Sequence, residues 1–376
     1  MKRIIYLTAI ALLICSSMST IKAQDDISNI FKAGVVDLNQ VANGYLKPAG
    51  NCFSAGLATN WYNTAAVHKL FGFDLTIGVG AIAAPQAERV FDLTGLTNLK
   101  PTITGTTQAP TLVGTGNGVE LNLMQPHFMA DGTTVNPLWN NGAGKITSFV
   151  TPAGLSQYVP TASVQFTIGL PFINDVSVRY APTVQSSGFE VSMFGIGIKH
   201  NLKQWLPIVK HLPIDVAVLF AYNKLDIKYT LPTEDQITPE KLVSGGLGYI
   251  PDATSSDYST QGASIIAKAM IANLIISKKL AFVTPYLGFG VTKTNFDLTL
   301  NGNFPTLDGL VIPGGTTTPM MQIKNISNPF QVSSTEVMPN ATIGLRMKLL
   351  WLFSLHAEYT LQKYPVASAG FGISIR

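Results

Sequence analysis

The residues best suited to chemistry in this 376-residue sequence are Ser354, His356 and Glu358, which occupy alternate positions near the C-terminus. A histidine activates a serine nucleophile when the two side chains lie within hydrogen-bond reach. Alternate positions on a strand share one face but lie about 7 Å apart, too far for direct contact between such short side chains. We therefore predict that the protein is not an enzyme and has no catalytic residue; a membrane hydrolase that uses His356 is the alternative.

Motifs for cofactors, metals and nucleic acid are absent from the sequence. The five histidines are dispersed, and none belongs to a cluster with the spacing of metal ligands. The glycines within 195–197 and 288–291 lie in alternating apolar segments and lack the context of a dinucleotide-binding turn. Lys and Arg number 25 against 21 Asp and Glu, with no basic patch. We expect no cofactor, no metal and no nucleic-acid partner.

The composition is typical neither of a disordered chain nor of a cytosolic enzyme. Hydrophobic residues make up 46% of the chain and charged residues 12%, with a mean hydropathy of +0.27; soluble domains carry about twice this charge. Residues 1–23 are predicted to be a signal peptide, because Lys2 and Arg3 precede the short apolar segment 4–14. Its removal leaves 22 basic and 21 acidic residues and one cysteine, Cys52, so no intrachain disulfide can form.

After residue 48 the hydrophobic period is two. Residues 71–81 alternate large apolar side chains with Gly, Asp and Thr, a pattern that predicts a strand with one apolar and one polar face. Eleven such strands are expected, at 52–62, 71–83, 158–170, 174–184, 188–200, 213–230, 261–277, 281–300, 338–350, 352–363 and 366–376. Short turns alternate with long connections at 84–157, 231–260 and 301–337, which is typical of a transmembrane barrel.

The predicted fold is all-β: a transmembrane antiparallel β-barrel of 12–14 strands with an N-terminal luminal helix. Bacterial single-chain barrels have an even number of strands, so eleven strands imply a missed one, within 119–124 or 301–337. A secreted β-sandwich is the alternative, but its strands are usually shorter. We expect a signal peptide at 1–23, a helix at 24–48 and a barrel at 49–376. The protein would reside in the outer membrane, with outer-membrane lipid and the barrel-assembly machinery as partners.

The polar faces of the strands would line the barrel interior if the apolar faces meet lipid. Strand parity predicts nine inward-facing ionisable residues: Asp74, Arg179, Glu190, Lys199, Asp215, Arg346, Lys348, His356 and Glu358. Apart from His356 these are four acids and four bases, so we expect cross-lumen ion pairs or a pore with little charge preference. Arg346 and Glu358, on adjacent strands of one hairpin, are placed to pair.

An amphipathic helix is predicted within 25–45, ahead of the first strand. A barrel of this size leaves a lumen that must be filled or hydrated. We expect the helix to plug it, with Phe31, Leu38 and Tyr45 meeting the barrel wall; a helix on the membrane surface is the alternative. The predicted function is passive passage of a small molecule, hydrophobic ligands included, gated by this helix. The alternative is a structural or adhesion-type barrel with a filled lumen and functional outer loops.

Four segments resemble an uncharacterised family of Bacteroidota-type outer-membrane β-barrel proteins: NCFSAGLATNWYNTA (51–65), GIGIKHNLKQWLP (195–207), TPYLGFG (284–290) and AEYTLQKY (357–364). The resemblance covers most of the chain after the signal peptide and implies the barrel fold without a substrate or functional residues. The chain also resembles the outer-membrane long-chain fatty acid transporters, which are barrels with an N-terminal hatch. Their hatch region has Asn-Pro-Ala where this chain has Lys47-Pro48-Ala49, so the resemblance does not carry a hatch mechanism.

Overall fold

The computed structural model describes residues 35–375, apart from 125–144, 243–247, 253–256 and the single positions 173, 187, 208, 315, 317, 319 and 351. The predicted signal peptide and residues 24–34 lie outside the described residues. None of the helices in the described part of the chain is long and apolar enough to cross a membrane.

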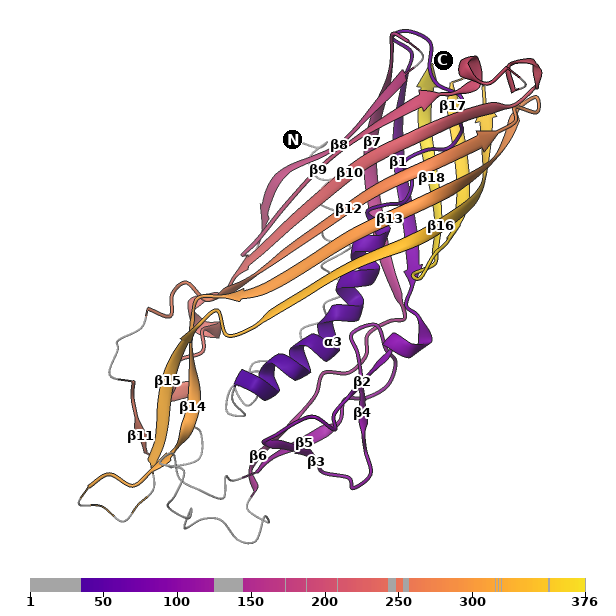
Figure 1. The fold of residues 1–376 in the computed structure, drawn as a ribbon. Helices are drawn as coiled ribbons and strands as arrows, with labels where there is room; N and C mark the ends of the chain where they lie inside the picture. Colours follow the sequence, from indigo (N-terminus) through magenta and orange to yellow (C-terminus); the bar gives the residue numbers. More distant parts are fainter. Residues whose placement is uncertain are drawn as a thin grey trace.

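Ten antiparallel strands close into a barrel, which confirms the predicted fold class (Figure 1). In their order around the barrel the strands are β1 (Phe73–Ala83), β18 (Val366–Ile375), β17 (Phe353–Leu361), β16 (Gln331–Leu349), β13 (Val283–Asn301), β12 (Gly262–Ser277), β10 (Asp215–Thr230), β9 (Phe189–Asn201), β8 (Asn174–Ser186) and β7 (Tyr158–Leu170). The pairing of β7 with β1 closes the ring.

The expected count of 12–14 strands was wrong, because 52–62 does not join the barrel wall, and neither 119–124 nor 301–337 adds a further strand to it; the end of 301–337, from Gln331, is part of β16. Residues 52–62 contain the last turn of a helix and a segment that enters the lumen, where their apolar side chains are buried. Residues 119–124 and 301–337 do contain new strands. These strands pair in small sheets outside the barrel, so only ten of the eleven expected strands remain.

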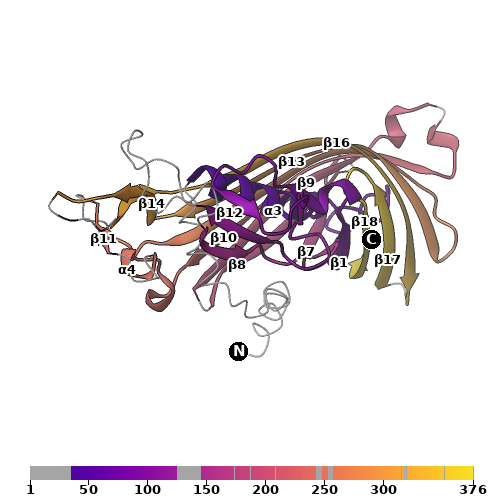
Figure 2. The same cartoon turned by 90° about the horizontal axis from the view of Figure 1, so that it is seen from below.

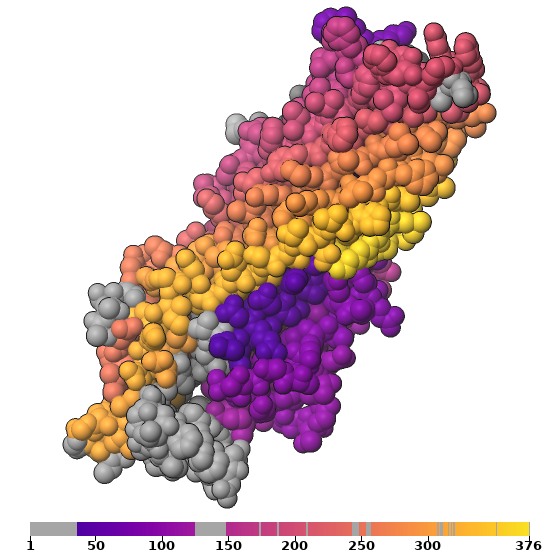
Figure 3. All heavy atoms as spheres, in the orientation of Figure 1, coloured from indigo at the N-terminus to yellow at the C-terminus, as the bar shows by residue number. Residues whose placement is uncertain are grey.

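The outer face of the barrel is apolar, and its inner face is polar. On β1, Leu75, Ile77 and Val79 are 42%, 46% and 57% exposed, whereas the intervening Asp74 and Thr76 are buried. This distribution is the reverse of that in a water-soluble sheet and is what a barrel surrounded by lipid requires. On the face drawn in the space-filling view, the neighbouring strands form a slanted wall (Figure 3).

The two ends of the barrel differ. Short turns join β7 to β8, β12 to β13 and β16 to β17 at one end, which we call the short-turn end. At the other, the long-connection end, further elements gather below the barrel (Figure 1). They are β2 (Val90–Asp92), β3 (Leu99–Pro101), β4 (Gln108–Pro110), β5 (Glu120–Met124), β6 (Lys145–Val150), α4 (Pro239–Leu242), β11 (Tyr249–Ile250), β14 (Asn303–Val311) and β15 (Met320–Ser327). They form the sheets β2–β4, β3–β5–β6 and β11–β15–β14.

Helix α3 (Val35–Gly56) starts among the long connections and ends inside the barrel (Figures 1 and 2). Near its start, the Asp37 carboxylate accepts hydrogen bonds from the three backbone N–H groups of 97–99, at 2.8 to 2.9 Å. Near its end, Cys52 and Ala55 are fully buried against Ile82 of β1 and other wall residues. The helix therefore joins the outer connections to the barrel wall.

The helix continues past Pro48, where the sequence predicted its end. A proline inside a helix removes one backbone hydrogen bond, so a compensating contact is needed. Gly50 supplies one, because it lies so close to the ring of Phe296 on β13 that a Cβ there would be 2.3 Å from a ring carbon. Packing against the wall therefore extends the helix by two turns beyond the position that local sequence favours.

Candidate functional site

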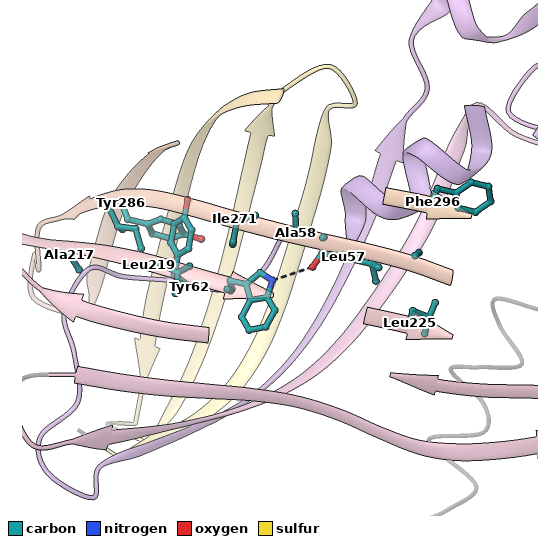
Figure 4. Packing of buried hydrophobic residues seen from close by; sticks show 14 of the residues in the cluster. Leu57, Ala58, Tyr62, Ala217, Leu219, Leu225, Ile271, Tyr286 and Phe296 are labelled. Carbon is teal, nitrogen blue, oxygen red and sulfur yellow. Dashed lines mark hydrogen bonds between the residues drawn. The ribbon is translucent and has the colours of Figure 1, made fainter. Parts of the chain in front are cut away.

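The barrel lumen is filled by the segment that follows α3. Residues 57–72, which we call the strap, cross the interior without regular structure and reach the short-turn end, where β1 begins. Figure 4 shows strap residues Leu57, Ala58 and Tyr62 among wall residues that include Leu219 and Tyr286. The strap overlaps the segment 51–65 that was singled out in the sequence.

The most bulky residue of the strap, Trp61, fits against two wall glycines. A Cβ at Gly195 or Gly197 of β9 would lie 3.1 or 3.0 Å from the indole ring. The indole N–H donates to the backbone carbonyl of Leu57 at 3.1 Å (Figure 4, dashed line). Glycine in a strand often marks a close approach of another group, and here that group is the strap.

Arg179 of β8 binds the strap where it leaves the helix. Its guanidinium donates to the backbone carbonyls of Leu57 and Thr59, at 3.3 and 2.8 Å, and to the side-chain oxygen of Gln165 at 3.0 Å. Its carbon Cζ lies 3.9 Å from the centroid of a Trp61 ring. The residue is 1% exposed, so this charge is stabilised by oriented carbonyl dipoles and an aromatic face in place of water.

A second group of contacts holds the strap at the short-turn end. Asp175 of β8 accepts hydrogen bonds from the backbone N–H of His68 at 2.8 Å and forms an ion pair with Lys199 of β9 at 3.0 Å. The Oδ2 atom of Asp175 also lies 3.1 Å from Nδ1 of the His68 ring. The Lys199 ammonium also donates to the backbone carbonyls of Thr64 and Ala66. Two wall residues of opposite charge therefore clamp 64–68 together.

A third group binds the middle of the strap. Glu358 of β17 accepts from the backbone N–H of Asn60 at 3.0 Å, from the Tyr286 hydroxyl at 2.9 Å and from the Ser368 hydroxyl at 3.2 Å. The ring of His356 contacts the Asn60 side-chain oxygen through Nε2 at 3.2 Å. Asn60 has φ +61°, a left-handed conformation that asparagine tolerates better than most residues.

None of the contacts given for Ser354, His356 and Glu358 joins one of these side chains to another. Ser354 lies 3.5 Å from the Gly372 carbonyl, and the other two side chains bind the strap. Arg346 also departs from expectation, since its guanidinium faces Asp74 of β1 at 3.7 Å instead of Glu358. Gly344 stands opposite Glu358 in the register. Within the described ranges, no three His, Cys, Asp or Glu side chains are grouped to hold a metal ion.

Six of the nine predicted luminal residues are buried in the interior: Asp74, Arg179, Lys199, Arg346, His356 and Glu358. Asp215 and Lys348 have the inward parity but lie half-buried near the short-turn rim, where Asp215 is 4.0 Å from Lys203. Glu190 is the exception. It shares the parity of the outward-facing Phe194 and Ile196 and hydrogen-bonds Gln185 on the surface at 2.8 Å, because the outward face turns polar near the long-connection end.

The predicted plug residues face the connections and not the wall. Leu38 is buried among Ile237, Phe304 and other residues of the long connections. Tyr45 packs in the cluster that includes Phe91, and its hydroxyl donates to the Ala153 carbonyl at 2.9 Å. Phe31 lies outside the described residues. This part of the helix sits in the barrel mouth, so its apolar side meets the connections, while the strap fills the lumen.

Little space remains beside the strap. A cavity lined by Asn60, Asp74 and Lys199, among other residues, has a volume of about 20 Å³, and one beside Thr59 and Glu358 has about 10 Å³. A single water molecule requires about 10–15 Å³ of such volume. The first cavity therefore has room for one or two water molecules and the second for at most one, so the strap and the side chains that bind it occupy this part of the lumen.

Sequence comparison places the chain in a family. A family described as "Family of unknown function (DUF6588)" matches residues 1–375. The chain belongs to this family. No curated protein matches the sequence.

Several solved outer-membrane barrels are similar in structure at very low identity. The translocator domain of the autotransporter NalP from Neisseria meningitidis is 8% identical, with 89% of this chain and 99% of that chain covered and a TM-score of 0.31. Ail, the attachment invasion locus protein of Yersinia pestis, is 7% identical over 82% and 99%, with a TM-score of 0.23. A FadL homologue of Pseudomonas aeruginosa is 9% identical over 89% and 96%, with a TM-score of 0.21.

The strap was missed in the sequence because its apolar residues were assigned to a strand at 52–62. One signal was available: Asn60, Trp61, Tyr62 and Asn63 break the period of two by placing two aromatic residues side by side. Asp175 and His68 had no comparable signal. They lie 107 positions apart, and only the closed barrel brings them together.

A fourth cluster joins the first long connection to the barrel rim. The Lys363 ammonium binds Glu336 at 2.8 Å and Glu88 at 3.0 Å, and the Tyr364 hydroxyl also donates to Glu88. Partial burial alone would lower the pKa of Lys363, but the hydrogen bonds to the two carboxylates outweigh it and raise the pKa above its ordinary value of 10.5. Such a group stabilises the folded state below its unfolded pKa, and the effect disappears as pH rises through the folded pKa.

We therefore predict a pH-dependent effect of Lys363→Met on stability. From pH 7 to 10 the variant should be less stable by under about 1 kcal/mol, because the pair is partly exposed and screened. The difference between the proteins should shrink as pH rises well above 10.5. Thermal unfolding of both proteins from pH 7 to 12 measures it, and a gap that widened at high pH would contradict the assignment.

Proposed function

We propose that the protein is an outer-membrane channel or transporter for a small molecule, held closed by the strap and opened when the strap moves. The observation that carries the proposal is that the lumen is closed by a segment outside the barrel wall. Arg179, Asp175, Lys199 and Glu358 attach this segment through side chains. A closure made by side chains can be released while all backbone pairs of the wall stay intact.

The strap replaces the helix as the proposed gate. The sequence placed the gate at 25–45, but the first half of α3 contacts the connections outside the lumen. Removing that half alone leaves 57–72 in place. We therefore expect that a deletion must extend through the strap to open a path.

Two deletions test this proposal in planar bilayers. The mature protein without residues 24–70 should show single-channel conductance steps, whereas the protein without 24–44 should stay as silent as the full-length protein. Heat-modifiable gel mobility confirms that each barrel is folded. Silence from a folded barrel that lacks 24–70 would reject the gated channel.

The second candidate is a structural or adhesion-type barrel whose outer connections are the functional part. It is favoured by the three small sheets at the long-connection end and by two buried clusters, around Phe91 and Phe304. These connections have cores of their own, so they present a fixed surface. Two results together would support this candidate. Both deletion variants should give no conductance, and the full-length protein should bind cell-surface material saturably. This binding should be lost when 90–124 is removed.

A further inference from the structure

The barrel wall holds the strap through backbone groups of the strap. Between Leu57 and His68, backbone carbonyls and backbone N–H groups bind side chains that point inward from β7, β8, β9, β12 and β17. These side chains include Gln165, Asp175, Arg179, Lys199, Ser277 and Glu358. Contacts to backbone groups do not depend on which side chains the strap carries, so the same wall can bind a chain of another sequence.

The carbonyls that the wall binds are alternate ones. Arg179 of β8 donates to the carbonyls of positions 57 and 59, and Gln165 of β7 donates to that of position 61 at 3.2 Å. Lys199 of β9 donates to the carbonyls of positions 64 and 66, at 3.3 and 3.1 Å. Alternate carbonyls on one side are a property of a polypeptide backbone, so the spacing of these donors matches amides and not the hydroxyls of a sugar.

Acceptors on the wall bind the N–H groups that lie between or beyond these carbonyls. Glu358, Ser277 and Asp175 accept from the N–H groups of positions 60, 65 and 68, at 3.0, 3.0 and 2.8 Å. Two of these acceptors are carboxylates, and two of the donors, Arg179 and Lys199, are cations. Hydrogen bonds to ionised groups are stronger than those between neutral groups. The site therefore has balanced charge and suits an uncharged ligand with strong dipoles, as an amide backbone is.

Glycines in the wall make room for the side chains of the strap. The Trp61 indole packs on the two glycines of β9 described above, and the Tyr62 hydroxyl lies where a Cβ at Gly288 of β13 would overlap it. The ring of Tyr62 meets that of Tyr286 edge to face, with centroids 5.9 Å apart (Figure 4). These two spaces are shaped for aromatic side chains and would be left open if the strap moved.

Release of the strap would also leave the polar groups of the site without their present partners. Arg179 and Asp175 are 1% and 0% exposed with the strap in place, and a buried charged group that loses its partner is costly. Water can replace these hydrogen bonds one at a time. A second peptide replaces carbonyls, N–H groups and aromatic rings together, in the order in which the wall already binds them.

We propose that the lumen is a binding site for short peptides that carry an aromatic side chain, and that the strap occupies this site as an intramolecular surrogate. This inference rests on the proposed transport function and names its substrate class. Because the wall contacts the backbone, sequence preference is confined to the aromatic positions. The strap is tethered and therefore has a high effective concentration, so a free peptide binds only when the strap is weakened or displaced.

Binding of a peptide to the full-length protein with a weakened strap tests this proposal. The variant Trp61→Ala/Tyr62→Ala empties the aromatic spaces and leaves every wall residue unchanged. The probe is a fluorescein-labelled peptide with the sequence of 57–68, LATNWYNTAAVH, and fluorescence anisotropy in detergent micelles measures its binding. It should bind the variant at least ten times more tightly than the wild-type protein, whose own strap fills the site. Equal binding to both proteins, or to neither, would overturn the proposal.

The matched probe is the same peptide with N-methyl groups at the positions of Asn60, Ala65 and His68. It keeps every side chain but cannot donate to the three acceptors of the wall, so it should bind the variant at least ten times more weakly. Maltoheptaose, an uncharged chain rich in hydroxyl groups, should not displace the labelled peptide. Equal affinity of the methylated peptide, or displacement by the sugar, would show that the wall does not recognise an amide backbone.

Heat-modifiable gel mobility confirms that the variant is folded. If the double variant does not fold, Trp61→Ala alone empties the larger space and allows the same comparison. Binding is measured without a conductance, so its result is separate from the deletion test of the gate. Conductance after deletion of 24–70 without peptide binding would overturn the peptide assignment alone. Peptide binding to a barrel that stays silent would support the peptide site and reject the gated channel.

Discussion

Asp175→Asn should destabilise the barrel by about 3–5 kcal/mol, the usual cost of removing one member of a buried ion pair. The carboxylate is fully buried and serves Lys199 together with both the backbone and the ring of His68. An asparagine keeps the shape but leaves the Lys199 charge without its counter-ion. The strap should detach at the short-turn end, so we expect conductance steps in planar bilayers as well as a lower urea midpoint.

The matched control for this variant is Asp297→Asn. Asp297 is also a carboxylate on a strand, with the Ser333 hydroxyl as its partner at 2.8 Å, but it is only partly buried and has the outward parity of β13. Its replacement should change stability by less than about 1 kcal/mol and leave the barrel silent. If Asp175→Asn behaved like this control in both measurements, the ion pair would not hold the strap.

Arg179→Leu should have a comparable effect, for a different reason. Leucine fills much of the same volume but removes the donor to the Thr59 carbonyl and to the side-chain oxygen of Gln165 inside the barrel, while the Leu57 carbonyl keeps its hydrogen bond from the Trp61 indole. Each unsatisfied buried acceptor costs about 1–3 kcal/mol, and the stacking on Trp61 is lost as well. We expect a loss of about 3–5 kcal/mol in urea unfolding and conductance that flickers as the middle of the strap moves.

The graded variant Arg179→Lys separates charge from geometry. Lysine keeps the positive charge but has no planar fork, so it can reach one carbonyl at a time; it should restore only part of the lost stability. Tyr180→Phe is the neighbouring control, since Tyr180 is exposed on the outer face and should be neutral. Full rescue by lysine would mean that charge alone anchors the strap.

The strands were predictable because lipid on one side and a polar lumen on the other impose a period of two on every strand. All ten barrel strands fall within predicted segments to within a few residues, except that β16 begins at Gln331 instead of 338. The interior position of Arg179, Lys199 and Glu358 followed from the same parity. Glu190 was wrongly predicted to face inward: it has the parity of the outward face of β9, which turns polar at Glu190 and Ser192 near the long-connection end, while Val191 and Met193 face the interior.

By itself, the sequence determined that this chain forms a membrane barrel, which residues face lipid, and which end carries the long connections, because each of these depends on neighbours within a few positions. Only the tertiary structure decided that 57–72 is a strap, that Asp175 meets His68, and that β7 and β8 separate. Each of these depends on contacts between distant segments, and ring closure selects those contacts. A strand edge has the same residues whether it is paired or free, so the separation of β7 from β8 emerges only once the register of all ten strands is set.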